Sequence, residues 1–268
     1  MLARIRQSGL VLPTLLTLAG LAVLVSLGTW QLSRKAWKDA LQARIEERMR
    51  ASPLTLDAVM GLYTATDAED PVARLEYRRV ALEGRFRHDR EQFLYAPHPT
   101  LGPGYHVLTP MELAGPSPRV VFVNRGYVPD ALKDRAKRAA GVPEGAASVT
   151  GLVRFTATPG GFTPPNEPAK NLWYWRDIAA LTAAAYPGEK PTPLPFTVDA
   201  EAAPANPGGW PQGGTTIVKL ANRHLEYALT WYGLALTLAG VYAVYAWSRL
   251  GGERRSGGGV RYTSRPDG

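Results

Sequence analysis

The chain has no cysteine, and it has only four methionines and four histidines among its 268 residues. It can form no disulfide, so a domain outside the cytoplasm would depend on packing and on membrane anchors for its stability. Soft metal ions such as copper are usually bound by Cys and Met. Met49, Met60 and Met111 are widely separated in the sequence, which argues against copper delivery and is typical of residues that fill a core.

The patterns that mark common enzymes are also missing. No serine lies in a G-x-S-x-G motif, and there is no H-E-x-x-H, Gly-rich phosphate loop or paired-carboxylate motif. His88, His98 and His106 are far apart for zinc ligands. We therefore expect a protein that is not an enzyme, with these histidines on the surface or satisfied in the core.

Two uncharged apolar runs, residues 9–30 and 227–247, lie near opposite ends of the chain. Each has about the 20 residues that a helix needs to cross a bilayer, so we predict two transmembrane helices. Arg4 and Arg6 before the first run also fit a cleaved signal peptide, although the run is longer than a usual signal core. Aromatic residues near both ends of the second run are typical of the two membrane interfaces.

The basic tails set the expected orientation. Five Arg residues follow the second run, against Lys219 and Arg223 before it, so the C-terminal tail is predicted to be cytoplasmic. Around the first run more positive charges lie on the domain side, which would favour a cytoplasmic domain. The tendency of positive charges to stay in the cytoplasm, however, weakens for long loops. The predicted organisation is a cytoplasmic N-terminal tail (1–8), a first span (9–30), an extracytoplasmic domain (31–226), a second span (227–247) and a cytoplasmic tail (248–268).

Much of the formal net charge of +8 lies in these tails. The domain is therefore only weakly basic and shows no nucleic-acid footprint. The Gly- and Arg-rich residues 251–268 have little to bury, so we predict that they are disordered and that their arginines contact anionic lipid heads.

Between the two runs the sequence pattern changes from helical to alternating. An amphipathic helix is predicted over residues 30–50 and a short helix over 56–62, followed by a loop at 64–71. Strands are predicted at 80–86, 92–96, 105–113, 119–127, 149–155 and 195–199. Insertions or loops are predicted at 131–145 and 187–193, and one helix at 178–186, capped by Asp177. The predicted fold class is an α+β membrane protein, in which two transmembrane helices flank a β-rich extracytoplasmic domain, an antiparallel sheet or small barrel with peripheral helices.

The most distinctive side chains lie where the second span begins. Helical spacing places His224, Tyr227 and Trp231 along one face. His224 has two interpretations: an interfacial histidine bonded to water or a headgroup, or an axial ligand of haem iron flanked by flat aromatic rings. In the second case Arg223 could pair with a propionate.

In the first span, Gly20 and Gly28 are two turns apart. They are candidates for close packing against the second span, or glycines that a membrane helix simply tolerates.

Six motifs follow one another along the chain. They are Leu27-Gly28-x-Trp30-Gln31 with Arg34 and Lys38; Tyr77-x-x-Val80-x-x-x-Gly84-x-Phe86; Gly104-Tyr105-x-Val107-x-Thr109-Pro110; Val123-Asn124-Arg125-Gly126-Tyr127-Val128-Pro129; Asn171-Leu172-Trp173-Tyr174 with Asp177; and Asn222-x-His224-Leu225-x-Tyr227-Ala228-x-Thr230-Trp231. In order and spacing, and within the two-span frame, they resemble the Surfeit-locus-one family of cytochrome c oxidase assembly factors. Tyr127 departs from that pattern, because Trp is frequent there.

The resemblance implies a non-enzymatic helper that acts while the haem a centre of the oxidase's largest subunit is built. For bacterial members it implies haem a binding, with His224 as the iron ligand; Tyr227, Trp231 and Trp30 would then shelter the haem at the outer interface. The expected partners are that subunit, the lipid bilayer and the enzyme that makes haem a. The expected location is the cell inner membrane, with the domain in the periplasm.

Two alternatives stay open at this point. The protein could be a membrane-anchored chaperone or scaffold for nascent oxidase subunits that binds no haem. Asn124, Arg125 and Gly126 could bind a partner, or could form a tight turn with Arg125 in a structural ion pair.

Overall fold

The computed structural model describes residues 9–66, 70–115, 119–156, 158–216 and 220–256. The chain forms two compact units, Met1–Ala43 with Lys219–Gly268, and Arg44–Val218. The first unit contains the apolar helices and the second contains the β-rich domain.

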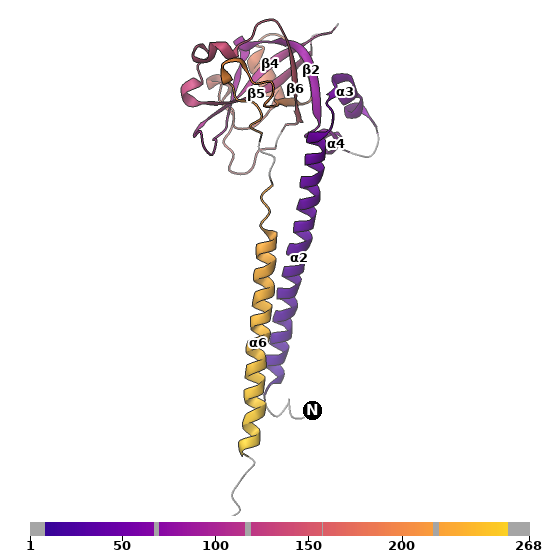
Figure 1. Ribbon diagram of the computed structural model, residues 1–268, viewed down its shortest axis with the longest axis vertical. Coiled ribbons are helices and arrows are strands. Elements are labelled where there is room, and N and C mark those ends of the chain that lie inside the picture. Colours follow the sequence, from indigo (N-terminus) through magenta and orange to yellow (C-terminus); the bar gives the residue numbers. More distant parts are fainter. Residues whose placement is uncertain (1–8, 67–69, 116–118, 157, 217–219, 257–268) are drawn as a thin grey trace, which may run out of the picture. The chain divides into compact units, whose positions relative to one another are not determined.

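Two long helices pack side by side in the first unit (Figure 1). They are α2 (Val11–Arg50) and α6 (His224–Ser256). Both are long and apolar enough to cross a membrane, as the sequence predicts. The predicted amphipathic helix at residues 30–50 is a direct continuation of α2, because no Gly or Pro interrupts the sequence between Gln31 and Arg50.

The C-terminal boundary of α6 corrects part of the prediction of a disordered tail. Residues 251–256 belong to this helix. The good helix formers Glu253, Arg254 and Arg255 offset the cost of the two glycines before them. The rest of that tail, residues 257–268, and the predicted N-terminal tail, residues 1–8, lie outside the described residues.

The second unit contains the eight strands and the short helices. The strands are β1 (Leu54–Thr55), β2 (Arg79–Phe86), β3 (Gln92–Tyr95), β4 (Gly104–Leu113), β5 (Arg119–Pro129), β6 (Ala146–Arg154), β7 (Thr192–Pro193) and β8 (Thr197–Ala200). The helices are α3 (Leu56–Thr64), α4 (Pro71–Leu75) and α5 (Ile178–Ala185), with 3-10 turns η1 (His88–Arg90), η2 (Asp130–Leu132), η3 (Arg135–Gly141), η4 (Pro168–Lys170) and η5 (Pro207–Gly209).

All six predicted strands and both predicted short helices are present, with shifted ends. Asp177 caps α5 as predicted, accepting a hydrogen bond from the Ala180 backbone N–H at 3.0 Å. The segments at 131–145 and 187–193 are not simply loops, because the first contains η3 and the second ends in β7.

Strands β2, β6, β8, β5 and β4 close a barrel, because β2 pairs with β6 along its length and also with the end of β4. Gly84 makes this closure possible, since a Cβ there would lie 2.3 Å from the Glu112 carbonyl oxygen. The small barrel is thus confirmed, but it is not purely antiparallel. The pairs β1–β2, β5–β7 and β5–β8 are parallel.

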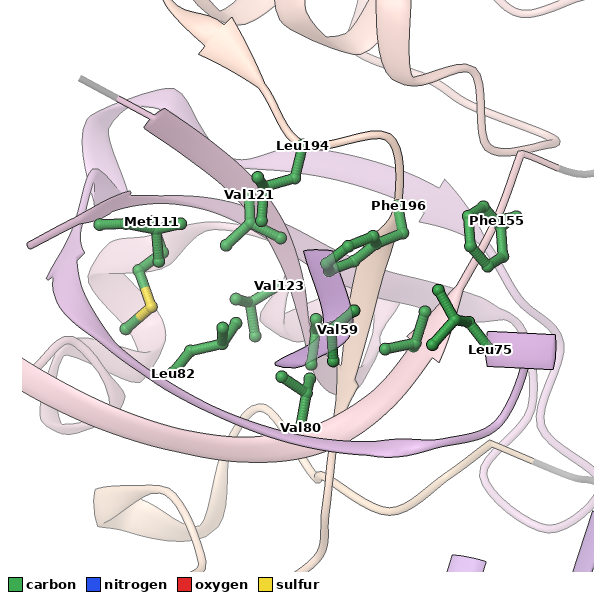
Figure 2. Close-up of a cluster of buried hydrophobic side chains, with 13 residues drawn as sticks. Val59, Leu75, Val80, Leu82, Met111, Val121, Val123, Phe155, Leu194 and Phe196 are labelled. Carbon is green, nitrogen blue, oxygen red and sulfur yellow. The ribbon is translucent and has the colours of Figure 1, made fainter. Parts of the chain in front are cut away.

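The core occupies the inside of the barrel, where side chains from several strands point toward one another (Figure 2). Val121 and Val123 of β5 face this interior, while Val120 and Phe122 pack with α5 in a second cluster. Because both faces of β5 are covered, the strand reads as an almost continuous apolar run.

Candidate functional site

The chain just before α6 is bonded to α2. Lys38 donates from Nζ to the Ala221 carbonyl oxygen at 2.7 Å, and Asn222 donates from Nδ2 to Asp39 Oδ1 at 2.8 Å. On α2 these bonds lie about two turns beyond Gln31, the residue that contacts His224. They fix the position along the axis of α2 at which α6 begins.

His224, the first residue of α6, contacts Gln31 on α2. The distance from His224 Nδ1 to Gln31 Oε1 is 2.6 Å. An amide oxygen only accepts, so Nδ1 is assigned as the protonated nitrogen and Nε2 as the nitrogen that carries the lone pair. No hydrogen-bond partner of Nε2 is present in the part of the chain that the structure describes. A histidine held in this way can offer Nε2 to a metal ion.

The sequence singled out His224 but not its partner. Gln31 is polar at the end of an apolar run, and it stands in the first of the six motifs. That was the only signal available, because a hydrogen bond between residues so far apart in the sequence cannot be read from either segment alone.

Gly20 and Gly28 lie where α2 and α6 approach closely. A Cβ on Gly28 would be 2.8 Å from the ring of Tyr232, and a Cβ on Gly20 would be 3.0 Å from Leu238 Cδ2. The larger side chains of α6 therefore occupy the space that the two glycines leave.

The contacts of Tyr232 define two sides of the helix pair. Tyr232 packs on Gly28, and its hydroxyl lies 3.1 Å from Thr29 Oγ1. On a helix with 3.6 residues per turn, Gly28 and Thr29 lie on one side of Gln31. Trp30, one residue before Gln31, lies on the other side.

The predicted aromatic residues lie on that other side. Tyr227 and Trp231 follow His224 by three and seven residues, so they lie away from Tyr232 and on the side of Trp30. Trp231 is half-buried, whereas Tyr227 and Trp30 are 53% and 54% exposed. Helical geometry thus puts His224, Trp231, Tyr227 and Trp30 on one side of the helix pair, at the end where α6 begins.

Arg223 is engaged elsewhere. Its guanidinium lies 2.9 Å from the Glu226 carboxylate, three residues further along the chain. A carboxylate of a bound molecule would have to share this guanidinium with Glu226.

Asn124, Arg125 and Gly126 lie inside the β-rich domain. The side chains of Asn124 and Arg125 are 2% exposed. Arg125 donates to the Gly141 carbonyl oxygen at 2.7 Å and to Asn206 Oδ1 at 2.8 Å. These contacts hold η3 and η5 against β5, and partner binding by the three residues stays a prediction.

Asp199 is a fully buried carboxylate next to Asn124. It accepts hydrogen bonds from Arg176 at 2.9 Å, from Asn124 Nδ2 at 3.1 Å and from Thr216 Oγ1 at 2.8 Å. Burial alone would raise the pKa of Asp199, but Arg176, Arg154 and the two uncharged donors outweigh it and lower the pKa. The ionised carboxylate thereby anchors Thr216, where the chain leaves the barrel.

The histidines of the domain do not form a metal site. In the described part of the chain, no group of three or more His, Cys, Asp or Glu side chains could hold a metal ion. His106 is half-buried, and the loss of water around its ring lowers its pKa to about 4. Its Nε2 lies 3.4 Å from Thr215 Oγ1.

Comparison with known proteins agrees with the resemblance seen in the motifs. Residues 18–236 match the profile of the SURF1 family. This chain belongs to the SURF1 family. The match covers the whole β-rich domain and the outer parts of α2 and α6, including His224 and Gln31.

Curated SURF1 relatives match at similar levels. A SURF1-like protein of Monosiga brevicollis is 36% identical over 88% of this chain and 87% of its own length. Surfeit locus protein 1 of Mus musculus is 35% identical over 80% of this chain and 69% of its own length. Surfeit locus protein 1 of Homo sapiens is 35% identical over 78% of this chain and 69% of its own length.

Proposed function

We propose that this SURF1-family protein is an assembly factor for cytochrome c oxidase, that it binds haem a through His224, and that it assists haem insertion into the largest oxidase subunit. The observation that carries the proposal is the His224–Gln31 hydrogen bond. It orients the imidazole and leaves Nε2 available as an axial ligand. The protein would act without catalysing a reaction of its own.

Family membership supports the general part of this proposal. The motifs resemble a family of cytochrome c oxidase assembly factors, and the profile match extends from residue 18 to residue 236. The finer part, haem a binding, rests on the residues at the outer ends of the two apolar helices.

The residues present fit a haem. Haem a, when bound, would supply an iron that an imidazole can ligate, a flat macrocycle, two carboxylates and an apolar tail. Trp231, Tyr227 and Trp30 offer flat apolar surfaces on the same side as His224. The apolar faces of α2 and α6 below them can accommodate a tail that lies along the bilayer.

The bilayer sets the depth of this site. From Val11 to Trp30, α2 has the length of about one hydrocarbon core, near 30 Å. Because His224 contacts Gln31, the imidazole lies at the boundary between hydrocarbon and headgroups. We place this boundary on the periplasmic side of the cell inner membrane, since the arginine-rich C-terminal tail favours the cytoplasm. From that position the β-rich domain can dock on the nascent oxidase subunit, and the enzyme that makes haem a can deliver its product.

The test is an absorption spectrum with a pyridine haemochrome assay on the full chain, purified in detergent after co-expression with the enzymes that make haem a. Wild type should show a haem a band and His224→Ala should lose it, while His98→Ala should keep it. Oxidase assembly should fall in a strain in which His224→Ala is the only copy.

Two results would contradict the proposal. A band of equal size in His224→Ala would place the ligand elsewhere. No band in wild type, with normal recovery of oxidase subunits on the protein, would identify the scaffold that binds no haem.

A further inference from the structure

Arg34 is a cation near His224 whose polar edge is free. Its guanidinium carbon lies 4.6 Å from the centroid of the Trp37 ring. Stacking on an aromatic ring uses the face of the guanidinium and leaves the N–H groups at its edge available. No acidic partner of Arg34 is present among the described residues.

The other cations at this level already have partners. They are Lys35 with Asp39 at 2.6 Å, Lys38 with the Ala221 carbonyl oxygen at 2.7 Å, and Arg223 with Glu226 at 2.9 Å. Among the described residues at this level, Arg34 is therefore the cation that a new anion can reach without competing with an existing partner.

Arg34 also has the right position relative to His224. It follows Gln31 by three residues, which is about 4.5 Å along the helix axis and away from the bilayer. The same helical geometry places it on the side of Trp30, Tyr227 and Trp231 rather than on the side of Tyr232. A flat ligand on His224 would thus have its outward edge beside Arg34.

We propose that Arg34 binds the carboxylate groups of haem a, with the Trp37 ring holding the guanidinium in place. This inference rests on the proposed function and replaces the sequence-based expectation that Arg223 pairs with a propionate. Arg34 suits the task because a guanidinium forms two parallel hydrogen bonds with one carboxylate. Its exposed position keeps the contact reversible.

The test compares haem a with its dimethyl ester, which lacks the two negative charges. Both are titrated into the detergent-purified full chain, in wild type, Arg34→Gln, Arg34→Lys and the matched control Arg44→Gln. For haem a, Arg34→Gln should weaken binding about tenfold or more, because bonds to charged groups are the strong ones. The absorption spectrum of bound haem should stay that of the His224 complex, Arg34→Lys should recover part of the affinity, and Arg44→Gln should match wild type.

The ester gives the decisive comparison. Wild type should lose affinity for the ester, whereas Arg34→Gln should bind haem a and its ester equally well. Trp37→Leu should weaken haem a binding when it is the only substitution, but should have no further effect when Arg34→Gln is already present.

Three results would overturn the inference. The first is an equal affinity of Arg34→Gln and wild type for haem a. The second is a loss of affinity for haem a in Arg223→Gln but not in Arg34→Gln. The third is that the Arg34→Gln substitution and esterification of haem a each lower the affinity by its own factor, with the two factors multiplying in the combination. That result would show that Arg34 binds another anion, such as a lipid phosphate. Failure of the proposed function looks different, because wild type would then bind neither compound, or His224→Ala would bind both as wild type does.

Discussion

Protonation of His106 should destabilise the protein at mildly acidic pH. Burial holds the pKa of His106 near 4 in the folded state, whereas an unperturbed histidine in the unfolded chain titrates near 6.5. The unfolded chain therefore binds more protons between these two values. The stability that depends on neutral His106 is fully present above about pH 6.5 and is lost as the pH falls toward about 4.

The size of the effect follows from the same two values. Proton linkage with a folded-state pKa of about 4 gives a loss of about 2 kcal/mol in the free energy of unfolding between pH 8 and pH 5. For a unit of the size of Arg44–Val218, that corresponds to a fall in Tm of roughly 4–8 °C. Carboxyl groups titrate mainly below pH 5, so this window reports mainly on histidines, and a His106 variant isolates the share of His106.

The assay is thermal unfolding of the full chain in detergent, followed by the fluorescence of tryptophans such as the buried Trp173, from pH 8 to pH 5. His106→Gln removes the titrating group and should flatten the pH dependence, whatever it does to the Tm at pH 8. Thr215→Ala removes the neighbouring hydroxyl and keeps the imidazole, so it should retain the wild-type slope. The reasoning is refuted if wild type and His106→Gln lose stability equally between pH 8 and pH 5.

Two further outcomes are expected from single substitutions. Asp199→Ala should lower the free energy of unfolding by about 3–5 kcal/mol, because it removes a buried carboxylate and leaves the half-buried Arg176 guanidinium without the carboxylate that it bonds. Glu189→Gln removes the exposed ion pair with Arg90 and should cost at most about 1 kcal/mol; equal losses in chemical denaturation would contradict this. Gly28→Ala should lower the Tm of the detergent-solubilised chain, since its Cβ meets the Tyr232 ring at 2.8 Å, by an amount that reflects roughly 1–3 kcal/mol of overpacking. The control Gly233→Ala has nothing within 4 Å of its Cβ, and a loss as large as that of Gly28→Ala would show that the close approach is unimportant.

Local patterns predicted the elements of the fold because each element is encoded over a few neighbouring residues. The alternation in β2 and the Asp177 cap of α5 are examples. The register and direction of pairing are not local in this sense. Nothing in the sequence of β8 indicates that it pairs in parallel with β5 and antiparallel with β6, because that choice depends on how the intervening chain returns to the barrel.

The same limit applies to the candidate site. His224 and the aromatic residues could be found from their spacing on one helix. Neither the contact of Gln31 with His224 nor the role proposed for Arg34 could be read from the sequence, because both depend on how α2 is shifted and rotated against α6. Arg223, next to His224, was expected to pair with a propionate. The structure pairs it with Glu226, three residues further along the chain, and its contact with a propionate stays a prediction.

The identity of the residue that holds His224 bears on how the site would release its ligand. A histidine that ligates a metal is often oriented by a carboxylate, whose charge raises the basicity of the imidazole. Here the acceptor is the uncharged amide oxygen of Gln31, which fixes the ring orientation with less gain in basicity. At the same time Arg34 would act from an exposed position, where solvent screens its charge. The Gln31 contact would therefore set geometry more than affinity, while the exposed Arg34 contact would add affinity that stays reversible. A protein that must pass its haem on benefits from that balance, since tight binding in one state alone would oppose transfer to the next.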